Sequence, residues 1–142
     1  MTTLNFSVIP HSHIDQGWLR TVREYQSETF SILDSIIYQL LDKNHRTFSW
    51  GDVLYFKEWF EQQGATRQQE VKKLVKDGRL EFVGGGWIQT DEACASYTSI
   101  INSMTVGNEY LLRRFGVRPR VAWQIGKLVD NGLMDYHWQI LS

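Results

Sequence analysis

The chain has 142 residues, of which 42% are hydrophobic and 13% aromatic, and its formal net charge is −1. This composition is too apolar and too aromatic for a disordered protein, and the length suits one domain. A charge so near zero gives no electrostatic basis for binding nucleic acid or an anionic membrane, and we expect neither as a partner.

The hydrophobic pattern predicts strands that alternate with helices. In the first helix, for example, apolar residues recur at steps of three and four. Asp52 is expected to cap the second helix. Alternating strands and helices imply an α/β fold with parallel strands and right-handed crossovers. The predicted strands are residues 4–9, 47–50, 80–83 and 120–124, and the predicted helices are residues 20–43, 53–61, 66–77 and 96–114.

Two histidines and a carboxylate follow directly on the first predicted strand, namely His11, His13 and Asp15. Side chains two residues apart in an extended segment point the same way, so these three can share one face. Two imidazoles and one carboxylate form part of a zinc site, still short of a full set of ligands. The alternative is a pair of buried histidines, with Asp15 capping a helix.

Further candidate residues follow the third predicted strand. They should reach the same rim of the sheet as the loop that contains His11, His13 and Asp15, called the His/Asp loop below. The glycines at 84–86 permit a close backbone approach or a positive φ. They form either a tight turn that lets Trp87 pack or a loop that shapes a substrate site. Asp91 and Glu92 could be paired acids, although adjacent side chains usually diverge. Trp18 could stack on a sugar face or pack in the core.

Residues 10–18, Pro-His-Ser-His-Ile-Asp-Gln-Gly-Trp, resemble the opening signature of the α-mannosidases of glycoside hydrolase family 38. Residues 79–87, followed by Asp-Glu-Ala at 91–93, resemble a second block of that family, and residues 115–125 resemble a third. Several collinear blocks are much harder to obtain by chance than one motif. The resemblance runs over about residues 6–125 and is strongest to the lysosomal-type branch.

The resemblance implies that residues 1–125 are part of a family 38 catalytic domain and that residues 126–142 are a tail foreign to the family. The fold it implies is a partial β/α barrel, the amino-terminal portion of a seven-stranded glycoside hydrolase barrel. Members of this branch enter the secretory route and reach the lysosome. Residues 1–3 lead straight into the first predicted strand, however, which leaves no room for a signal peptide.

The activity that the resemblance implies is zinc-dependent, retaining hydrolysis of an α-mannoside or of an oligosaccharide derived from an N-glycan. By this resemblance the metal ligands are His13 and Asp15, the supporting residues are His11 and Asp91, and the substrate-binding residues are Trp18 and Trp87.

Gly126 departs from the family pattern, because an aspartate that is both zinc ligand and nucleophile belongs at that position. The chain is therefore expected to be an inactive fragment. One interpretation is that residues 126–142 are translated intron. If an intron interrupts the aspartate codon after its first base, read-through into a common splice donor encodes Gly-Lys, the residues found at 126 and 127. The alternatives are a non-catalytic product with a binding role and a metal-dependent hydrolase of another class, such as a polysaccharide deacetylase-like enzyme.

Overall fold

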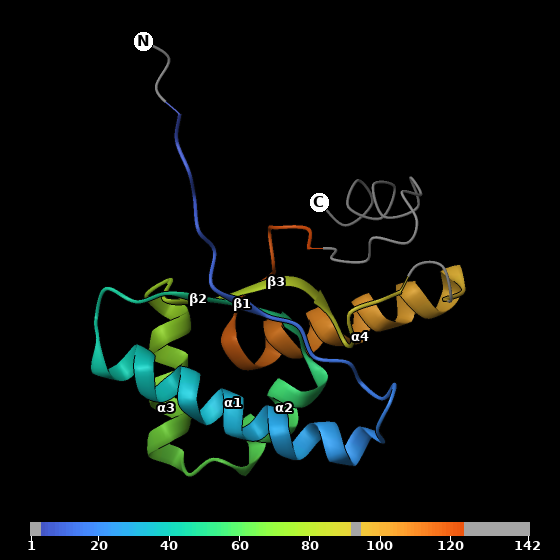
Figure 1. Ribbon diagram of the computed structural model, residues 1–142, viewed down its shortest axis with the longest axis horizontal. Coiled ribbons are helices and arrows are strands. Elements are labelled where there is room, and N and C mark those ends of the chain that lie inside the picture. Colours follow the sequence, from blue (N-terminus) through green and yellow to red (C-terminus); the bar gives the residue numbers. More distant parts are fainter. Residues whose placement is uncertain (1–3, 92–94, 124–142) are drawn as a thin grey trace.

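The computed structural model describes residues 4–91 and 95–123, which contain one parallel sheet with the strand order β1-β2-β3 (Figure 1). Strand β1 pairs with β2, and β2 pairs with β3, each in the parallel sense. This arrangement confirms an α/β fold in which parallel strands alternate with helices. The strands are β1 (His11–Ser12), β2 (Phe48–Asp52) and β3 (Leu80–Gly86), and the helices are α1 (Val22–Asp42), α2 (Leu54–Gln62), α3 (Ala65–Lys76) and α4 (Tyr97–Phe115).

The hydrophobic core joins the sheet to all four of these helices. Side chains at alternate strand positions, such as Trp50 and Phe82, belong to this core, as the two-residue period of a strand requires. Phe56 of α2 meets the ring of Phe82 edge-on, with ring centroids 4.8 Å apart. Phe115, at the end of α4, lies 4.9 Å from the ring of Phe60. These contacts fix α2, β3 and α4 relative to one another and support the carboxyl ends of the strands.

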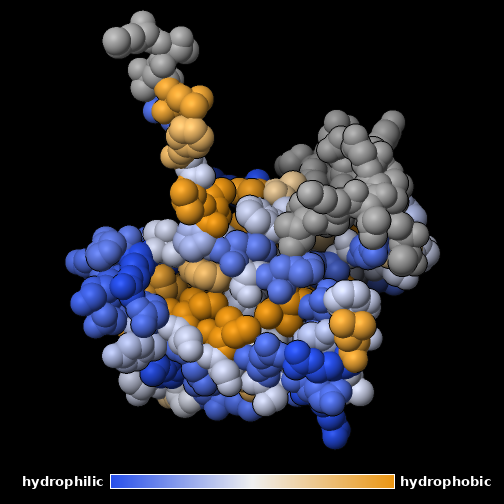
Figure 2. Space-filling model, in the orientation of Figure 1, coloured by the Kyte–Doolittle hydropathy of each residue, from blue (hydrophilic) through white to orange (hydrophobic). Residues whose placement is uncertain are grey.

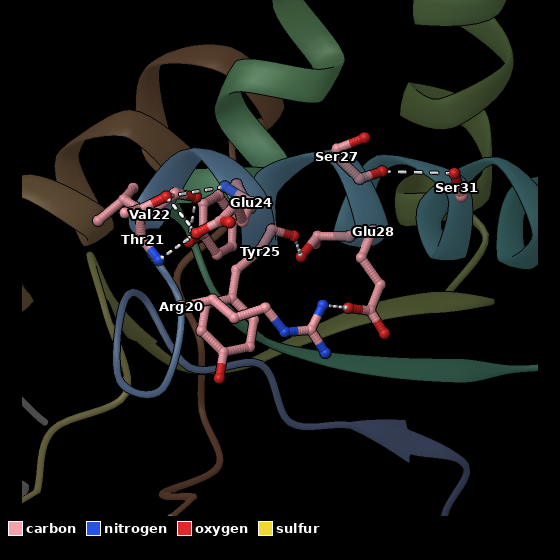
Figure 3. Close-up of polar contacts among 10 residues, drawn as sticks. Arg20, Thr21, Val22, Glu24, Tyr25, Ser27, Glu28 and Ser31 are labelled. Carbon is pink, nitrogen blue, oxygen red and sulfur yellow. Dashed lines mark hydrogen bonds and ion pairs between the residues drawn. The ribbon is translucent and has the colours of Figure 1, made fainter.

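Helix α1 begins at a capping box that ends the loop after β1 (Figure 3). The Thr21 hydroxyl oxygen accepts a hydrogen bond from the backbone N–H of Glu24, and the Glu24 carboxylate accepts one from the backbone N–H of Thr21 at 2.8 Å. The hydrogen bonds that the Thr21 backbone N–H and hydroxyl donate to the carboxylate hold the pKa of Glu24 below its usual range. Arg20 pairs with Glu28 at 2.9 Å and lies over the ring of Tyr25. The His/Asp loop is thus anchored at both ends.

The expectation of a strand at residues 4–9 is wrong, because the structure forms β1 at His11–Ser12 and leaves residues 4–9 without strand pairing. His11 pairs with Ser49, so the same register would place residues 4–9 opposite residues 42–47. Those residues are the end of α1 and the loop after it, which offer no strand. The apolar side chains of this segment are consequently exposed, as Figure 2 shows along the extended amino-terminal chain.

The expected strand at residues 120–124 is also absent from the part that the structure describes, which ends at Trp123. Its place beside β3 is nevertheless indicated by one backbone hydrogen bond, from the N–H of Gly84 to the carbonyl of Val121 at 2.8 Å. A single bond of this kind does not make a ladder. The segment after α4 therefore follows β3 without forming a strand there.

The glycines of β3 form an irregularity within the strand rather than a turn after it. Trp50 pairs with Phe82 and Asp52 pairs with Gly86, so β3 has two more residues than β2 over this stretch. The extra residues are Gly84 and Gly85, whose φ values of 68° and 79° lie in the region that favours glycine.

Asp52 is not the N-cap residue of α2. The N-cap of that helix is Val53, which makes no capping hydrogen bond through its side chain, and Asp52 is the buried last residue of β2. The strand simply continues two residues further than its apolar pattern indicated. Among the described residues, no helix has the length and apolar character needed to cross a bilayer.

Candidate functional site

His13 lies between two polar side chains at the rim formed by the carboxyl ends of the strands. Its Nε2 atom is 3.3 Å from Oδ1 of Asp15, on the same loop. Its Nδ1 atom is 2.8 Å from Oε1 of Gln89, in the segment that follows β3. The side chains of His13 and Asp15 are 43% and 41% exposed, so both remain accessible to a ligand. The pairing of β1, β2 and β3 therefore brings two distant loops together at one imidazole.

The spacing of His13 and Asp15 matches that of two ligands on one zinc ion. Ligand atoms about 2.0 Å from a tetrahedral zinc lie about 3.3 Å from each other, and Nε2 of His13 lies 3.3 Å from Oδ1 of Asp15. Within residues 4–91 and 95–123, however, no group of three or more His, Cys, Asp or Glu side chains is arranged to hold a metal. The described residues thus bring two candidate ligands together, and the zinc site stays a prediction.

A pocket of about 340 Å³ opens beside this pair and is lined by residues from both loops and from α4. Trp18, a residue that is 74% exposed, lines the pocket, and Asp91 lines it from the segment after β3. Trp87 is not among the lining residues; it packs against the hydrophobic core. Of the two tryptophans assigned to substrate from the sequence, the structure brings only Trp18 to the pocket.

His11 lies in β1 itself, half-buried behind the pocket. Its Nδ1 atom is 3.0 Å from the carbonyl oxygen of Ser49, which can only accept, so the ring donates from Nδ1. Burial lowers the pKa of His11, which favours the neutral ring. Its ring packs against that of Trp123, with centroids 4.3 Å apart. His11 therefore lies next to the site, and the backbone at the end of β1 connects it to His13.

Two residues of this rim were not singled out from the sequence as site residues. Gln89 bonds to His13, and Asp52 is a buried carboxyl group at the end of β2. Burial raises the pKa of Asp52 to about 7, against the opposing effects of the Tyr55 backbone N–H and the Gln16 side chain. The signal for Asp52 was its position at a strand end. The signal for Gln89 was weaker, because a glutamine after a strand is common at any surface.

Two of the positions singled out from the sequence lie outside the described residues. Glu92 belongs to residues 92–94, and Gly126 belongs to residues 124–142. Their predicted roles, including the missing nucleophile at Gly126, rest on the sequence alone.

An α/β domain with polar side chains gathered at the carboxyl ends of parallel strands belongs to a class of folds that places active sites at that rim. The model of the glycosyl hydrolases family 38 N-terminal domain matches residues 3–127. The chain belongs to that family.

The relatives are α-mannosidases. Alpha-mannosidase B of Dictyostelium discoideum is 45% identical over 123 residues, which cover 86% of this chain and 12% of that protein. Lysosomal alpha-mannosidase of Mus musculus is 42% identical over 133 residues, which cover 86% of this chain and 13% of that protein. The chain therefore spans about an eighth of the length of these relatives.

A solved structure supports the fold. The alpha-mannosidase from Enterococcus faecalis V583 superposes with a TM-score of 0.64 at 21% identity, covering 78% of this chain and 12% of that one. At this identity the likeness concerns the fold alone. The division at residue 125 stays a prediction, as does closure of the sheet into a seven-stranded barrel.

Proposed function

We propose that this chain carries the amino-terminal part of a zinc-dependent α-mannosidase site and does not hydrolyse mannosides by itself. The substrate class of the complete site would be an α-mannoside, such as the terminal mannose of an N-glycan-derived oligosaccharide, and the compartment would be the lysosome. Relatives named lysosomal alpha-mannosidase support this proposal. Membership of family 38 leaves the deacetylase-like alternative without support.

The observation that carries the proposal is the 3.3 Å separation of Nε2 of His13 and Oδ1 of Asp15, two residues that line one pocket. A pair buried in the core would indicate a structural role, whereas both of these side chains are more than one-third exposed. Both also line the pocket together with Trp18. The donor atoms are a neutral imidazole nitrogen and a carboxylate oxygen, which are ligand types that zinc prefers.

In this proposal His13 and Asp15 would hold the zinc, and Trp18 would offer its ring to the apolar face of a sugar. Zinc bound there would supply a Lewis acid that orients and polarises sugar hydroxyl groups. Asp91 lines the same pocket, where its carboxylate would accept a hydrogen bond from a further hydroxyl. Trp87 would act from the core by supporting the segment that carries Gln89 and Asp91.

Gly126 explains why the chain alone would be inactive. Retaining glycosidases need a carboxylate that forms a covalent intermediate, and glycine has no side chain to attack with. Of the acidic residues that the structure describes, Asp15 and Asp91 line the pocket, and this proposal makes them a metal ligand and a hydrogen-bond acceptor. Binding without turnover is the expected behaviour.

The test measures zinc affinity and hydrolysis on the purified chain, after circular dichroism has shown that it is folded. We expect His13→Ala and Asp15→Ala each to weaken zinc binding at least tenfold. The matched control is His45→Ala, because His45 is exposed in the loop after α1. We expect no metal-dependent release from an aryl α-mannoside. Zinc affinity that is equal in all four proteins would refute the metal site, and turnover that needs zinc would refute the inactivity.

A further inference from the structure

We propose that Gln89 is a positioning residue that holds the proton of His13 on Nδ1 and thereby keeps the Nε2 lone pair directed toward the position beside Asp15. The inference rests on the proposed function in one respect, since it takes the group bound at Nε2 to be a zinc ion. The assignment of the proton rests on the orientation of the Gln89 amide, independently of any metal.

The hydrogen bond that carries this inference joins the two rim loops. Oε1 of Gln89 lies 2.8 Å from Nδ1 of His13, a distance typical of a good hydrogen bond. With the amide oxygen toward the ring, Nδ1 is the donor, because an amide oxygen can only accept. A neutral imidazole has one N–H, so a proton on Nδ1 leaves Nε2 as the lone-pair nitrogen. That nitrogen is the one 3.3 Å from Asp15.

Gly51 makes the space in which Gln89 reaches His13. A Cβ atom at position 51 would lie 2.8 Å from Nε2 of Gln89 and 3.1 Å from Cε1 of His11. Any larger residue on β2 would push the amide away from the imidazole. Three neighbouring strands therefore contribute to one contact: β1 leads to His13, β2 provides the gap at Gly51, and β3 leads to Gln89.

The orientation of the Gln89 amide decides which ring nitrogen of His13 carries the proton. With its oxygen toward His13, the ring presents a lone pair to a cation. With the amide reversed, its NH₂ group would donate to Nδ1, place the proton on Nε2 and block that atom as a ligand. The two orientations thus make opposite predictions for the tautomer.

The tautomer can be measured without any metal, by two-bond ¹H–¹⁵N correlation spectra of the folded chain at a pH where imidazole is neutral. Asp15 competes for the Nε2 proton, so the decisive comparison uses the Asp15→Ala background. With Gln89 present, we expect the Nδ1–H form of His13. With Asp15→Ala and Gln89→Ala combined, we expect the Nε2–H form that free histidine prefers. The Nε2–H form in both proteins would overturn the proposal.

The consequence for binding is tested with zinc itself, in competition with a chromophoric chelator and with Asp15 intact. Loss of the residue that orients a ligating histidine weakens metal binding by about 10- to 100-fold, and we expect this for Gln89→Ala. Gln89→Glu should restore the affinity, because a carboxylate still accepts from Nδ1. Gln69→Ala, an exposed change on α3, is the control and should have no effect.

These two measurements separate the possible failures. If the unaltered chain binds no zinc, the proposed function fails, and the tautomer spectra still decide whether Gln89 sets the proton on His13. If zinc binds equally to the unaltered chain and to Gln89→Ala, the proposed function survives and the role of Gln89 in metal binding is refuted.

Discussion

The ring of His11 lies against the ring of Trp123, with centroids 4.3 Å apart, although the two residues come from opposite ends of the described chain. Two glycines border this contact. A Cβ at Gly51 would lie 3.1 Å from Cε1 of His11, and a Cβ at Gly84 would lie 3.7 Å from the carbonyl oxygen of Trp123. The rings therefore meet where β2 and β3 have no side chains, directly behind the candidate site.

Gly51→Ala is expected to weaken zinc binding about as much as Gln89→Ala does. The added methyl group would lie 2.8 Å from Nε2 of Gln89, which is the far end of a flexible side chain, so the amide should move away from His13. Because that movement is easy, the free energy of unfolding should fall by only about 1 kcal/mol. Chelator competition and urea denaturation measure the two effects. Unchanged zinc affinity would show that Gln89 is not held through this gap.

Gly107→Ala should destabilise the protein strongly, although alanine favours a helix by about 1 kcal/mol relative to glycine. A Cβ at Gly107 would lie 2.2 Å from the carbonyl oxygen of Gly85, which is backbone and cannot rotate aside. Helix α4 would have to move away from β3, at a cost of about 3 kcal/mol or more.

Gly64→Ala is the matched control for this substitution. Nothing lies within 4 Å of its added methyl group, and Gly64 has a φ of −64°. Its free energy of unfolding should change by less than about 1 kcal/mol. Equal losses for the two variants in urea denaturation would contradict the close approach of α4 to β3.

Asp52→Asn should make stability depend less on pH. Burial raises the pKa of Asp52 from 3.8 to about 7, so the folded state holds a proton that the unfolded state has released between these values. Stability of the unaltered chain should therefore fall as the pH rises through this window. The variant has no charge to bury. Its free energy of unfolding, relative to that of the unaltered chain, should therefore increase with pH by a few kcal/mol at most, since one pKa unit is about 1.4 kcal/mol.

Denaturant unfolding at about pH 4 and about pH 8 measures this difference, with Asp42→Asn, an exposed change at the end of α1, as the control. The advantage of Asp52→Asn should be small at the lower pH and large at the higher one. An advantage that is equal at both values would show that the carboxyl group of Asp52 does not titrate in this window.

Thr21→Ala should lower the free energy of unfolding by about 1 kcal/mol, because it removes the oxygen that caps α1. Thr21→Ser keeps that oxygen and should retain most of the stability. The His/Asp loop ends at this cap, so the alanine variant should also speed amide hydrogen exchange in residues 13–20. Exchange there that matches the serine variant would mean that the loop is held independently of the cap.

The helices were predictable because their signals are local. The expected helices at 20–43, 66–77 and 96–114 correspond to Val22–Asp42, Ala65–Lys76 and Tyr97–Phe115. Apolar side chains at three- and four-residue steps fix a helical face without reference to the rest of the chain. The alternation of strands with helices likewise led to parallel pairing, which the structure confirms.

The strands were less predictable because a strand exists only where another strand offers hydrogen bonds. Residues 4–9 alternate as a strand should, but the register of β1 on β2 leaves them no partner. Asp52 was expected to cap a helix, and only the pairing of β2 with β3 shows that it ends a strand instead.

The candidate site was likewise predictable from the sequence only in part. The proximity of His13 and Asp15 was predictable from the sequence, because a spacing of two residues in one short motif brings their side chains together. Their role as metal ligands stays a prediction. The partner of His13 was not evident, because Gln89 is 76 residues away along the chain. Only the parallel register of three strands, with a glycine at position 51 to leave room, brings that amide to the imidazole.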